Sequence, residues 1–220
     1  MVNTSKTYPN ARNPKFATRN KKHRRNIMYK NITTPLTDEI IKDLKAGDRV
    51  LISGKIYAAR DAAHIRLCDA LTKGETLPMD LAGQIIYYAG PCPPKPGCVT
   101  GPFGPTTSGR MDKYTPQMLE QGLKGMIGKG ERSSEVIEAM KAKKAVYLTA
   151  IGGAGALIAT TIREIKTVAY EDLGAEAIME LVVEELPVIV AIDCSGGNLY
   201  QTEPLKYKDK YSELDNRGKG

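Results

Sequence analysis

The sequence predicts a single α/β domain. Through most of the 220 residues, segments with alternating or continuous apolar residues are separated by segments with apolar residues at helical spacing. Apolar residues make up 41% of the chain, which is enough for one substantial core. The sequence has no internal repeat that would divide this core into smaller units.

The first half of the chain contains two helix signals and two strand signals. Residues 37–46 begin with a Thr–Asp pair, which favours a helix cap, and end before a glycine, so we expect a short helix. Residues 48–59 alternate between apolar and polar and predict a strand that bends at Gly54. Residues 60–74 carry apolar side chains at helical spacing, and residues 84–90 are typical of a short buried strand.

The second half continues the alternation beyond a long loop. Residues 91–110 have Pro or Gly at nearly every second position, and ordered loops of that length often carry function. A short apolar piece and a glycine loop follow at 124–131. The other predictions are helices at 115–123, 133–144 and 152–165, strands at 145–151, 180–186 and from 188 onward, and a strand or loop at 167–173.

The net charge of +7 is concentrated at the N-terminus. Residues 1–27 hold eight basic side chains and no acidic one, whereas the rest of the chain holds 24 basic and 25 acidic residues. The sequence therefore predicts a basic leader over residues 1–31 that is disordered in isolation, a nearly neutral domain over 32–207 and a charged tail over 208–220.

Three interpretations of the leader remain open. It could be an arm that binds RNA or a membrane surface, or a transit peptide, because it is basic and free of acids. It could also be untranslated, because the residues RRNIM at 24–28 can be encoded by a purine-rich ribosome-binding sequence followed by a start codon. In that case translation would begin at Met28.

The cysteines and the hydropathy indicate a cytoplasmic protein without a metal site of its own. No apolar run approaches the roughly 20 residues that span a bilayer, and the N-terminus lacks the apolar region of a secretory signal. No C-x-x-C pair occurs among the four cysteines, which favours reduced thiols. They lie at positions 68, 92, 98 and 194.

Two glycine- or turn-rich junctions have both an ordinary and a functional interpretation. The residues IGGAGALIA at 151–159 resemble a dinucleotide turn, but Ile158 occupies the place of the third glycine, which favours a tight strand-to-helix turn whose amides could line a small-anion pocket. In ARDAAH, Arg60 could bind a carboxylate at the start of a helix, or it could pair with Asp61 while Asp61 caps that helix. His64 in the same motif is more often structural than catalytic.

The residues GPTTSGRMD at 104–112 contain polar and charged side chains that a turn does not require. A turn uses the Gly and Pro, whereas two threonines, Ser108 and Arg110 would suit a small anion. Lys129 stands between glycines that let the backbone bring a cation close to a ligand. Together with Arg60, these groups would complement a dicarboxylate. The sequence shows no paired carboxylates, Cys–His pair or metal-ligand cluster, so lytic chemistry would need groups from another chain.

These motifs resemble those of one enzyme family. GPTTSGRMD after GPCPPKPG, with ARDAAH upstream and GKG downstream, resembles the β subunit of class I fumarases, iron–sulfur hydro-lyases whose family includes the L-tartrate dehydratase β subunit. The resemblance covers about residues 32–207. It implies a swivelling β/β/α domain, reversible hydration of fumarate to (S)-malate, and an obligate α subunit that ligates a four-iron–four-sulfur cluster. It implies no nucleic-acid or membrane partner.

The resemblance also assigns roles to individual residues. Arg60 and Arg110 would bind the substrate carboxylates, and Thr106 would be the general base. Apart from the resemblance, His64, one turn beyond Arg60, is a second catalytic candidate. Lys129 would contact the substrate, although its spacing from Arg110 is one residue shorter than in the single-chain enzymes. The rest of the substrate-binding segment would be Thr107, Ser108 and Gly109.

Gly109 bears on the choice of substrate. The sequence TSGRMD matches fumarases, whereas the tartrate enzymes resemble TSMRME, so we expect a fumarase β subunit. The alternative is the β subunit of L-tartrate dehydratase or of a related hydroxy-dicarboxylate hydro-lyase. An alternative from another class is a stand-alone module that binds small anions or RNA through the leader and the glycine loops.

Overall fold

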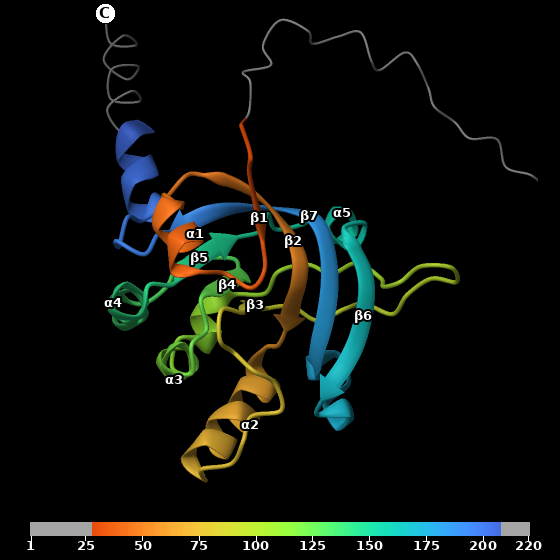
Figure 1. Ribbon diagram of the computed structural model, residues 1–220. Helices are drawn as coiled ribbons and strands as arrows, with labels where there is room; N and C mark the ends of the chain where they lie inside the picture. Colours follow the sequence, from red (N-terminus) through yellow and green to blue (C-terminus); the bar gives the residue numbers. More distant parts are fainter. Residues whose placement is uncertain (1–27, 208–220) are drawn as a thin grey trace, which may run out of the picture.

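The computed structural model describes residues 28–207, so the predicted leader and charged tail lie outside the described residues. The described residues form one mixed α/β domain around a closed barrel of strands (Figure 1), which confirms the predicted fold class. No helix in this part of the chain is long and apolar enough to cross a membrane.

The barrel is built from four parallel strands and one long antiparallel strand. In order around the barrel, β2 (Arg49–Ala58), β3 (Ile85–Tyr87), β4 (Gly125–Gly128) and β5 (Val146–Thr149) pair in parallel. The long strand β7 (Ile178–Ile192) runs antiparallel to both β5 and β2 and closes the ring. Closure leaves no free edge between these strands.

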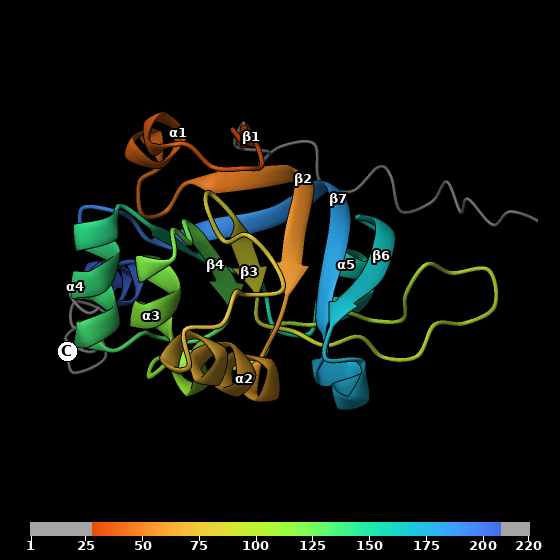
Figure 2. The same ribbon diagram turned by 60° about the horizontal axis from the view of Figure 1, so that its bottom comes forward.

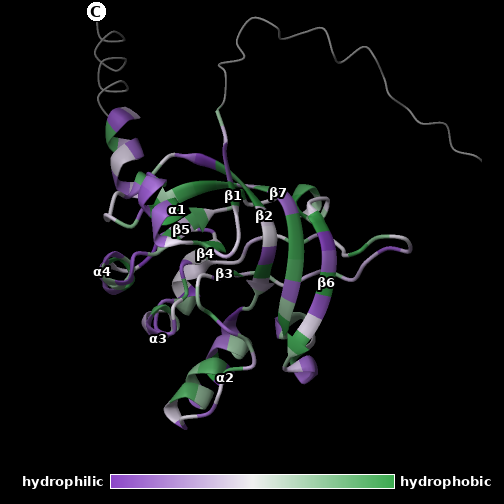
Figure 3. Cartoon of the chain, in the orientation of Figure 1, coloured by the Kyte–Doolittle hydropathy of each residue, from purple (hydrophilic) through white to green (hydrophobic). Residues whose placement is uncertain are grey.

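Two further strands extend the sheet beyond the barrel. Strand β1 (Lys30–Thr33) is parallel to the first half of β2, and β6 (Ile162–Ala169) is antiparallel to the first half of β7. The predicted helix over 152–165 is therefore wrong beyond α5 (Gly155–Ala159), because pairing with β7 takes residues 162–165 into a strand. β6 carries hydrophilic stretches, whereas β7 is largely hydrophobic (Figure 3).

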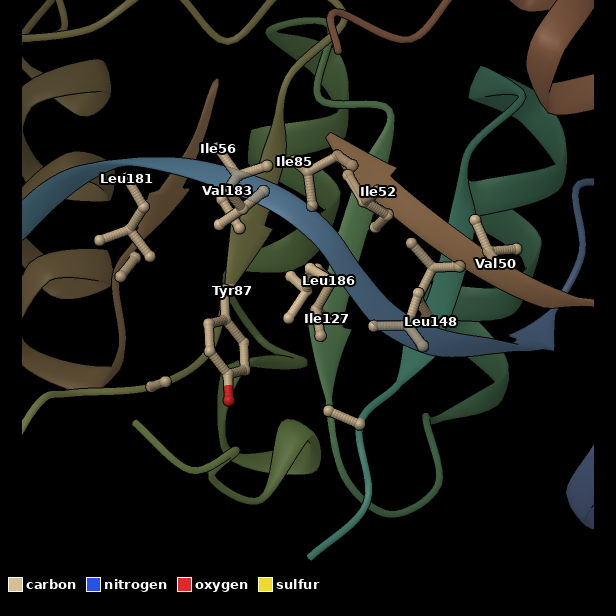
Figure 4. Packing of buried hydrophobic residues seen from close by; sticks show 14 of the residues in the cluster. Val50, Ile52, Ile56, Ile85, Tyr87, Ile127, Leu148, Leu181, Val183 and Leu186 are labelled. Atoms are coloured by element: carbon tan, nitrogen blue, oxygen red, sulfur yellow. The ribbon is translucent and has the colours of Figure 1, made fainter. Parts of the chain in front are cut away.

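Apolar residues fill both faces of the central strands. On β3, Ile85 and Tyr87 belong to the cluster inside the barrel, whereas Ile86 belongs to the cluster under the helices. Figure 4 shows the interior cluster, to which Leu148 of β5 and Leu186 of β7 also belong. Burial on both faces explains why these strands read as continuous apolar runs in the sequence.

Helices α2 (Asp61–Thr72), α3 (Thr115–Glu120) and α4 (Ser134–Lys143) cover the outer face of β3–β5 (Figure 2), whereas α1 (Asp38–Asp43) contributes Ile41 to the other cluster. The predicted helices appear with shorter bounds, and the side chains of Thr37 and Ser133 cap α1 and α4 by accepting from backbone N–H groups. Residues 199–207 are also helical. Two 3₁₀ helices are also present among the described residues, η2 (Ser108–Met111) and η3 (Glu171–Glu176).

The two strands predicted after residue 180 are one bent strand. In β7, Glu185 has φ 53°, and the register of β2 against β7 shifts between Ile52 and Gly54. Gly54 has φ 112°, and a Cβ there would lie 2.6 Å from Thr34 Oγ1, so the bend requires glycine. The predicted bend at Gly54 is confirmed.

Candidate functional site

The residues predicted to bind a ligand gather where the parallel strands end. Arg60 comes two residues after β2, and Lys129 directly follows β4. Because β2, β3 and β4 are parallel neighbours, their carboxyl ends meet at one edge of the barrel. In α/β folds the loops at this edge form ligand sites.

The loop after β3 returns to this edge and adds Thr106 to it. After projecting away from the barrel over 91–101 (Figure 2), the chain comes back so that the Thr106 N–H donates to the Tyr88 carbonyl at 2.8 Å. The Lys129 N–H then donates to the Thr106 carbonyl at 3.1 Å, and Thr107 pairs with Lys129 as an isolated parallel bridge. Thr106 therefore lies between the ends of β3 and β4.

Ser108 faces inward, and its hydroxyl forms a hydrogen bond within the protein. Its side chain is fully buried, and its Oγ lies 2.9 Å from Tyr147 Oη. Since Tyr147 Oη donates to the Gly130 carbonyl at 2.8 Å, Ser108 must donate to Tyr147. Burial raises the pKa of Tyr147, so this phenol stays neutral. Ser108 thus anchors its segment, and the substrate contact predicted for it stays a prediction.

Arg110 is held by the helix that follows β2. Its Nε donates to Asp61 Oδ1 at 2.8 Å, and its Nη2 pairs with Asp61 Oδ2. The guanidinium lowers the pKa of Asp61, so the carboxylate is ionised at neutral pH. Arg110 nevertheless keeps 49% of its side chain exposed, which leaves part of the guanidinium free for a ligand.

Arg60 has a different partner from the one that the sequence suggests. It is the N-cap residue of α2, and its Nη2 lies 3.2 Å from Glu176 Oε1. Glu176 Oε2 also accepts from the Ala62 N–H at 2.9 Å, so one carboxylate holds both the arginine and the start of the helix. The interpretation in which Asp61 caps the helix and pairs with Arg60 is therefore wrong.

His64 lies beneath this arrangement. Its ring is fully buried between Tyr88 and Tyr114, and Nδ1 donates to the Arg60 carbonyl at 3.1 Å. Burial lowers its pKa from 6.5 to about 4, so the ring is neutral. The ring supports the backbone of Arg60, and the catalytic role predicted for His64 stays a prediction.

Sequence reasoning missed Arg132, which is fully buried behind the site. It pairs with Asp112 at the end of η2 and lies over the rings of Tyr88 and Tyr147. A lone arginine in GERSS carries no sequence signal for such a role. Its effect is to fix the loop after β4 against the segment that bears Arg110.

Arg110 and Lys129 stand on an open surface, whereas Arg60 is half-buried. Lys129 and Gly109 are exposed, and a Cβ at Gly109 would have the Glu131 carbonyl oxygen, at 3.9 Å, as its neighbour. Two cavities of about 420 and 410 Å³ flank the loop 91–101 instead, and neither is lined by Arg60, Arg110 or Lys129. A small ligand bound at these cations would need a further wall to exclude water.

The cysteines do not form a metal site among the described residues. Cys68 lies on α2, Cys92 and Cys98 are exposed on the loop after β3, and Cys194 follows β7. Within residues 28–207, no group of three or more His, Cys, Asp or Glu side chains could hold a metal ion.

Comparison with known proteins gives consistent similarities. A family model described as Fumarase C-terminus matches residues 1–203. A candidate L(+)-tartrate dehydratase subunit beta from Methanocaldococcus jannaschii is 38% identical over 81% of this chain and 95% of its own length. The aerobic class I fumarate hydratase of Salmonella typhimurium is 38% identical over 74% of the chain, and fumarate hydratase 2 of Leishmania major is 37% identical over 70%. The chain spans 29% and 28% of these two longer proteins.

Proposed function

Because the chain belongs to the Fumarase C-terminus family, we propose that it is the β-type subunit of a hydro-lyase for a four-carbon hydroxy-dicarboxylate. The subunit would be active together with an α-type partner. One observation carries the proposal. Arg60, Arg110 and Lys129 stand at one edge of the barrel, joined through Asp61 and through the Thr107–Lys129 backbone pair.

The two arginines suit the two carboxylates of such a substrate. Each guanidinium can bind a carboxylate through parallel hydrogen bonds, which fixes the orientation of the carbon chain between them. Holding the reacting carbons in place in this way supplies a large part of the rate in such reactions. Lys129 would add charge beside the bound ligand.

Thr106 is the group on this chain that we assign to the proton on carbon 3. It is half-buried between Tyr88 and Lys129, with its backbone groups bonded to both. A neutral hydroxyl is a weak base, so the cations at this edge would have to favour its ionised form. The roles of Arg60, Arg110, Thr106 and Lys129 follow from the resemblance, and their placement at one edge supports them.

The open surface supports a partner that completes the site. The relative from Methanocaldococcus jannaschii is described as a subunit, and the fumarate hydratases match this chain with less than a third of their length. An α-type chain seated on this edge would enclose the ligand and exclude water.

The iron–sulfur cluster implied by the resemblance does not fit the cysteines of this chain. Three thiolates at one place are needed to hold such a cluster, and the described residues offer no group of three ligands. We therefore place the cluster on the partner and assign this chain the binding and orientation of the substrate.

The substrate is either L-tartrate or the fumarate–malate pair. The relative that matches over nearly its whole length is described as a tartrate dehydratase subunit, and this favours the alternative over the fumarase that the sequence predicts. The specific observation in favour of fumarate is Gly109, which lacks the bulk found at this place in TSMRME.

Anaerobic purification of the tagged full chain from its own host, with whatever copurifies, tests the proposal. Dehydration of L-tartrate or of (S)-malate by a complex with an iron-containing second chain would support it, and the ratio of the two rates would identify the substrate. A complex that dehydrates neither would contradict the proposed function.

A further inference from the structure

Asp61 connects the two arginines of the candidate site. It directly follows Arg60 in the chain, as the first residue of α2, and it binds Arg110 from a segment 49 residues away. Among the residues that the structure describes, Asp61 is the one whose side chain binds the Arg110 guanidinium and whose backbone is bonded directly to Arg60.

The geometry leaves one edge of Arg110 for a ligand. A guanidinium has five N–H donors, and Asp61 occupies the edge formed by Nε and Nη2. Both donors of Nη1 and the second donor of Nη2 remain. One Nη1 donor and this Nη2 donor form the end-on edge, which can bind another carboxylate bidentately. Asp61 therefore orients Arg110 without competing for that edge.

Glu176 holds the other arginine to the same turn of helix. It contacts Arg60 Nη2 and accepts from the Ala62 N–H, one residue beyond Asp61. Both guanidiniums are thus tied to the first turn of α2, one through Asp61 and one through Glu176. The distance between them therefore depends on this one helical turn and not on two independent loops.

We infer that Asp61 is a positioning residue that fixes the separation of Arg60 and Arg110 and so makes the site selective for the length of a dicarboxylate. The inference rests on the proposed function, because it takes both arginines as carboxylate-binding groups. It predicts that Asp61 affects binding through Arg110 without touching the substrate itself.

The test uses the full chain in its copurified complex and three variants. Asp61→Asn keeps the shape but removes the charge, Asp61→Glu keeps the charge but moves it, and Asp172→Asn is a matched control. Asp172 of η3 forms a bidentate pair with Arg66 of α2, and neither residue is among those assigned to bind the substrate. For each variant we would measure kcat and KM, and the calorimetric binding of succinate and glutarate, dicarboxylates of four and five carbons that need no turnover.

The expected result is a loss of length selectivity in Asp61→Asn. Its kcat/KM falls about 10- to 100-fold, and the ratio of glutarate to succinate dissociation constants moves toward one, because Arg110 is no longer held at a fixed distance. Asp61→Glu recovers part of the succinate affinity, and Asp172→Asn stays within about twofold of the wild type in every measurement.

Two results for the Asp61→Asn variant would overturn the inference. Tighter succinate binding in Asp61→Asn would mean that Asp61 competes with the ligand, and values equal to those of Asp172→Asn would mean that it positions nothing. The proposed function fails if the wild-type complex turns over neither malate nor tartrate. If that complex nevertheless binds succinate more tightly than glutarate, loss of this preference in Asp61→Asn still supports the inference. If the wild-type complex binds neither dicarboxylate, both fail.

Discussion

Arg132 donates through Nε to Asp112 Oδ1 at 2.7 Å, although its side chain has no exposed surface. Its Nη2 donates to Thr115 Oγ1 at 2.7 Å, and Asp112 Oδ2 accepts from the Ser133 N–H at 2.7 Å. The pair joins the end of η2 to the loop after β4. These are the two segments that present Arg110 and Lys129, so a buried ion pair holds the candidate site together from behind.

Replacing Asp112 by alanine should destabilise the full chain strongly. The variant leaves the buried Arg132 cation without its carboxylate, and removing one partner of a buried pair costs about 3–5 kcal/mol. Urea unfolding followed by circular dichroism measures the loss. In the control Asp172→Ala, the partner Arg66 is solvated and the change should be much smaller. Equal losses in the two variants would show that the Arg132 pair is not structurally important.

Gly128→Ala should cost about 1–3 kcal/mol of folding free energy. A Cβ at position 128 would lie 2.0 Å from Ser108 Oγ, which is fixed by its bond to Tyr147. The double variant Gly128→Ala/Ser108→Ala removes the clashing oxygen, so its loss should be smaller than the sum of the two single losses by about 1 kcal/mol. Additive losses in urea unfolding would contradict the close approach of these residues.

Gly109→Met should leave stability unchanged and alter the choice of substrate. A Cβ at this position has open space, with the Glu131 carbonyl oxygen 3.9 Å away, so the larger side chain fits without displacing the protein. We expect an unchanged unfolding midpoint and a tartrate-to-malate rate ratio for the copurified complex that rises several-fold. An unchanged ratio would remove Gly109 from the residues that select the substrate.

Much of the fold could be predicted because its signals are local. The cap residues Thr37 and Ser133 mark helix starts, and the alternation in 48–59 marks β2. Strand β4 carries no such signal, since it is only Gly125–Gly128 and becomes a strand by pairing with β3 and β5. Likewise, residues 162–165 fit a helical spacing and become β6 only because β7 is available as a partner.

The candidate site could be predicted as a set of residues but not as a set of contacts. Arg60, Arg110 and Lys129 stand out because they are isolated cations beside glycines and turns. Their partners are distant in sequence: Asp61 binds Arg110 across 49 residues, and Glu176 belongs to the connection before β7. A sequence pattern cannot report such pairs, since the barrel closure that brings them together is itself non-local.

Arg110→Lys should lower kcat/KM of the copurified complex about 100-fold. A lysine has one ammonium group, so it cannot hold Asp61 through two parallel bonds and present a second flat edge to a carboxylate. Arg163→Lys is a suitable control, because Arg163 of β6 forms an exposed ion pair with Glu184 of β7. Steady-state kinetics on both substrates would detect the difference, and equal activities in the two variants would exclude a bidentate role for Arg110.

The buried ring of His64 predicts how stability depends on pH. Burial lowers its pKa from 6.5 to about 4, so the unfolded chain binds a proton between these values and the folded chain does not. The stabilising effect is complete above pH 6.5 and is lost as the pH falls toward 4, with about 2 kcal/mol lost between pH 7.5 and pH 5. Urea unfolding across this range measures the slope.

Among the other groups, Asp38 has its pKa lowered to about 2 and so titrates below this pH range, and His23 lies outside the described residues. The variant His64→Gln should therefore be nearly insensitive to pH between 7.5 and 5, and a slope equal to that of the wild type would show that another group titrates.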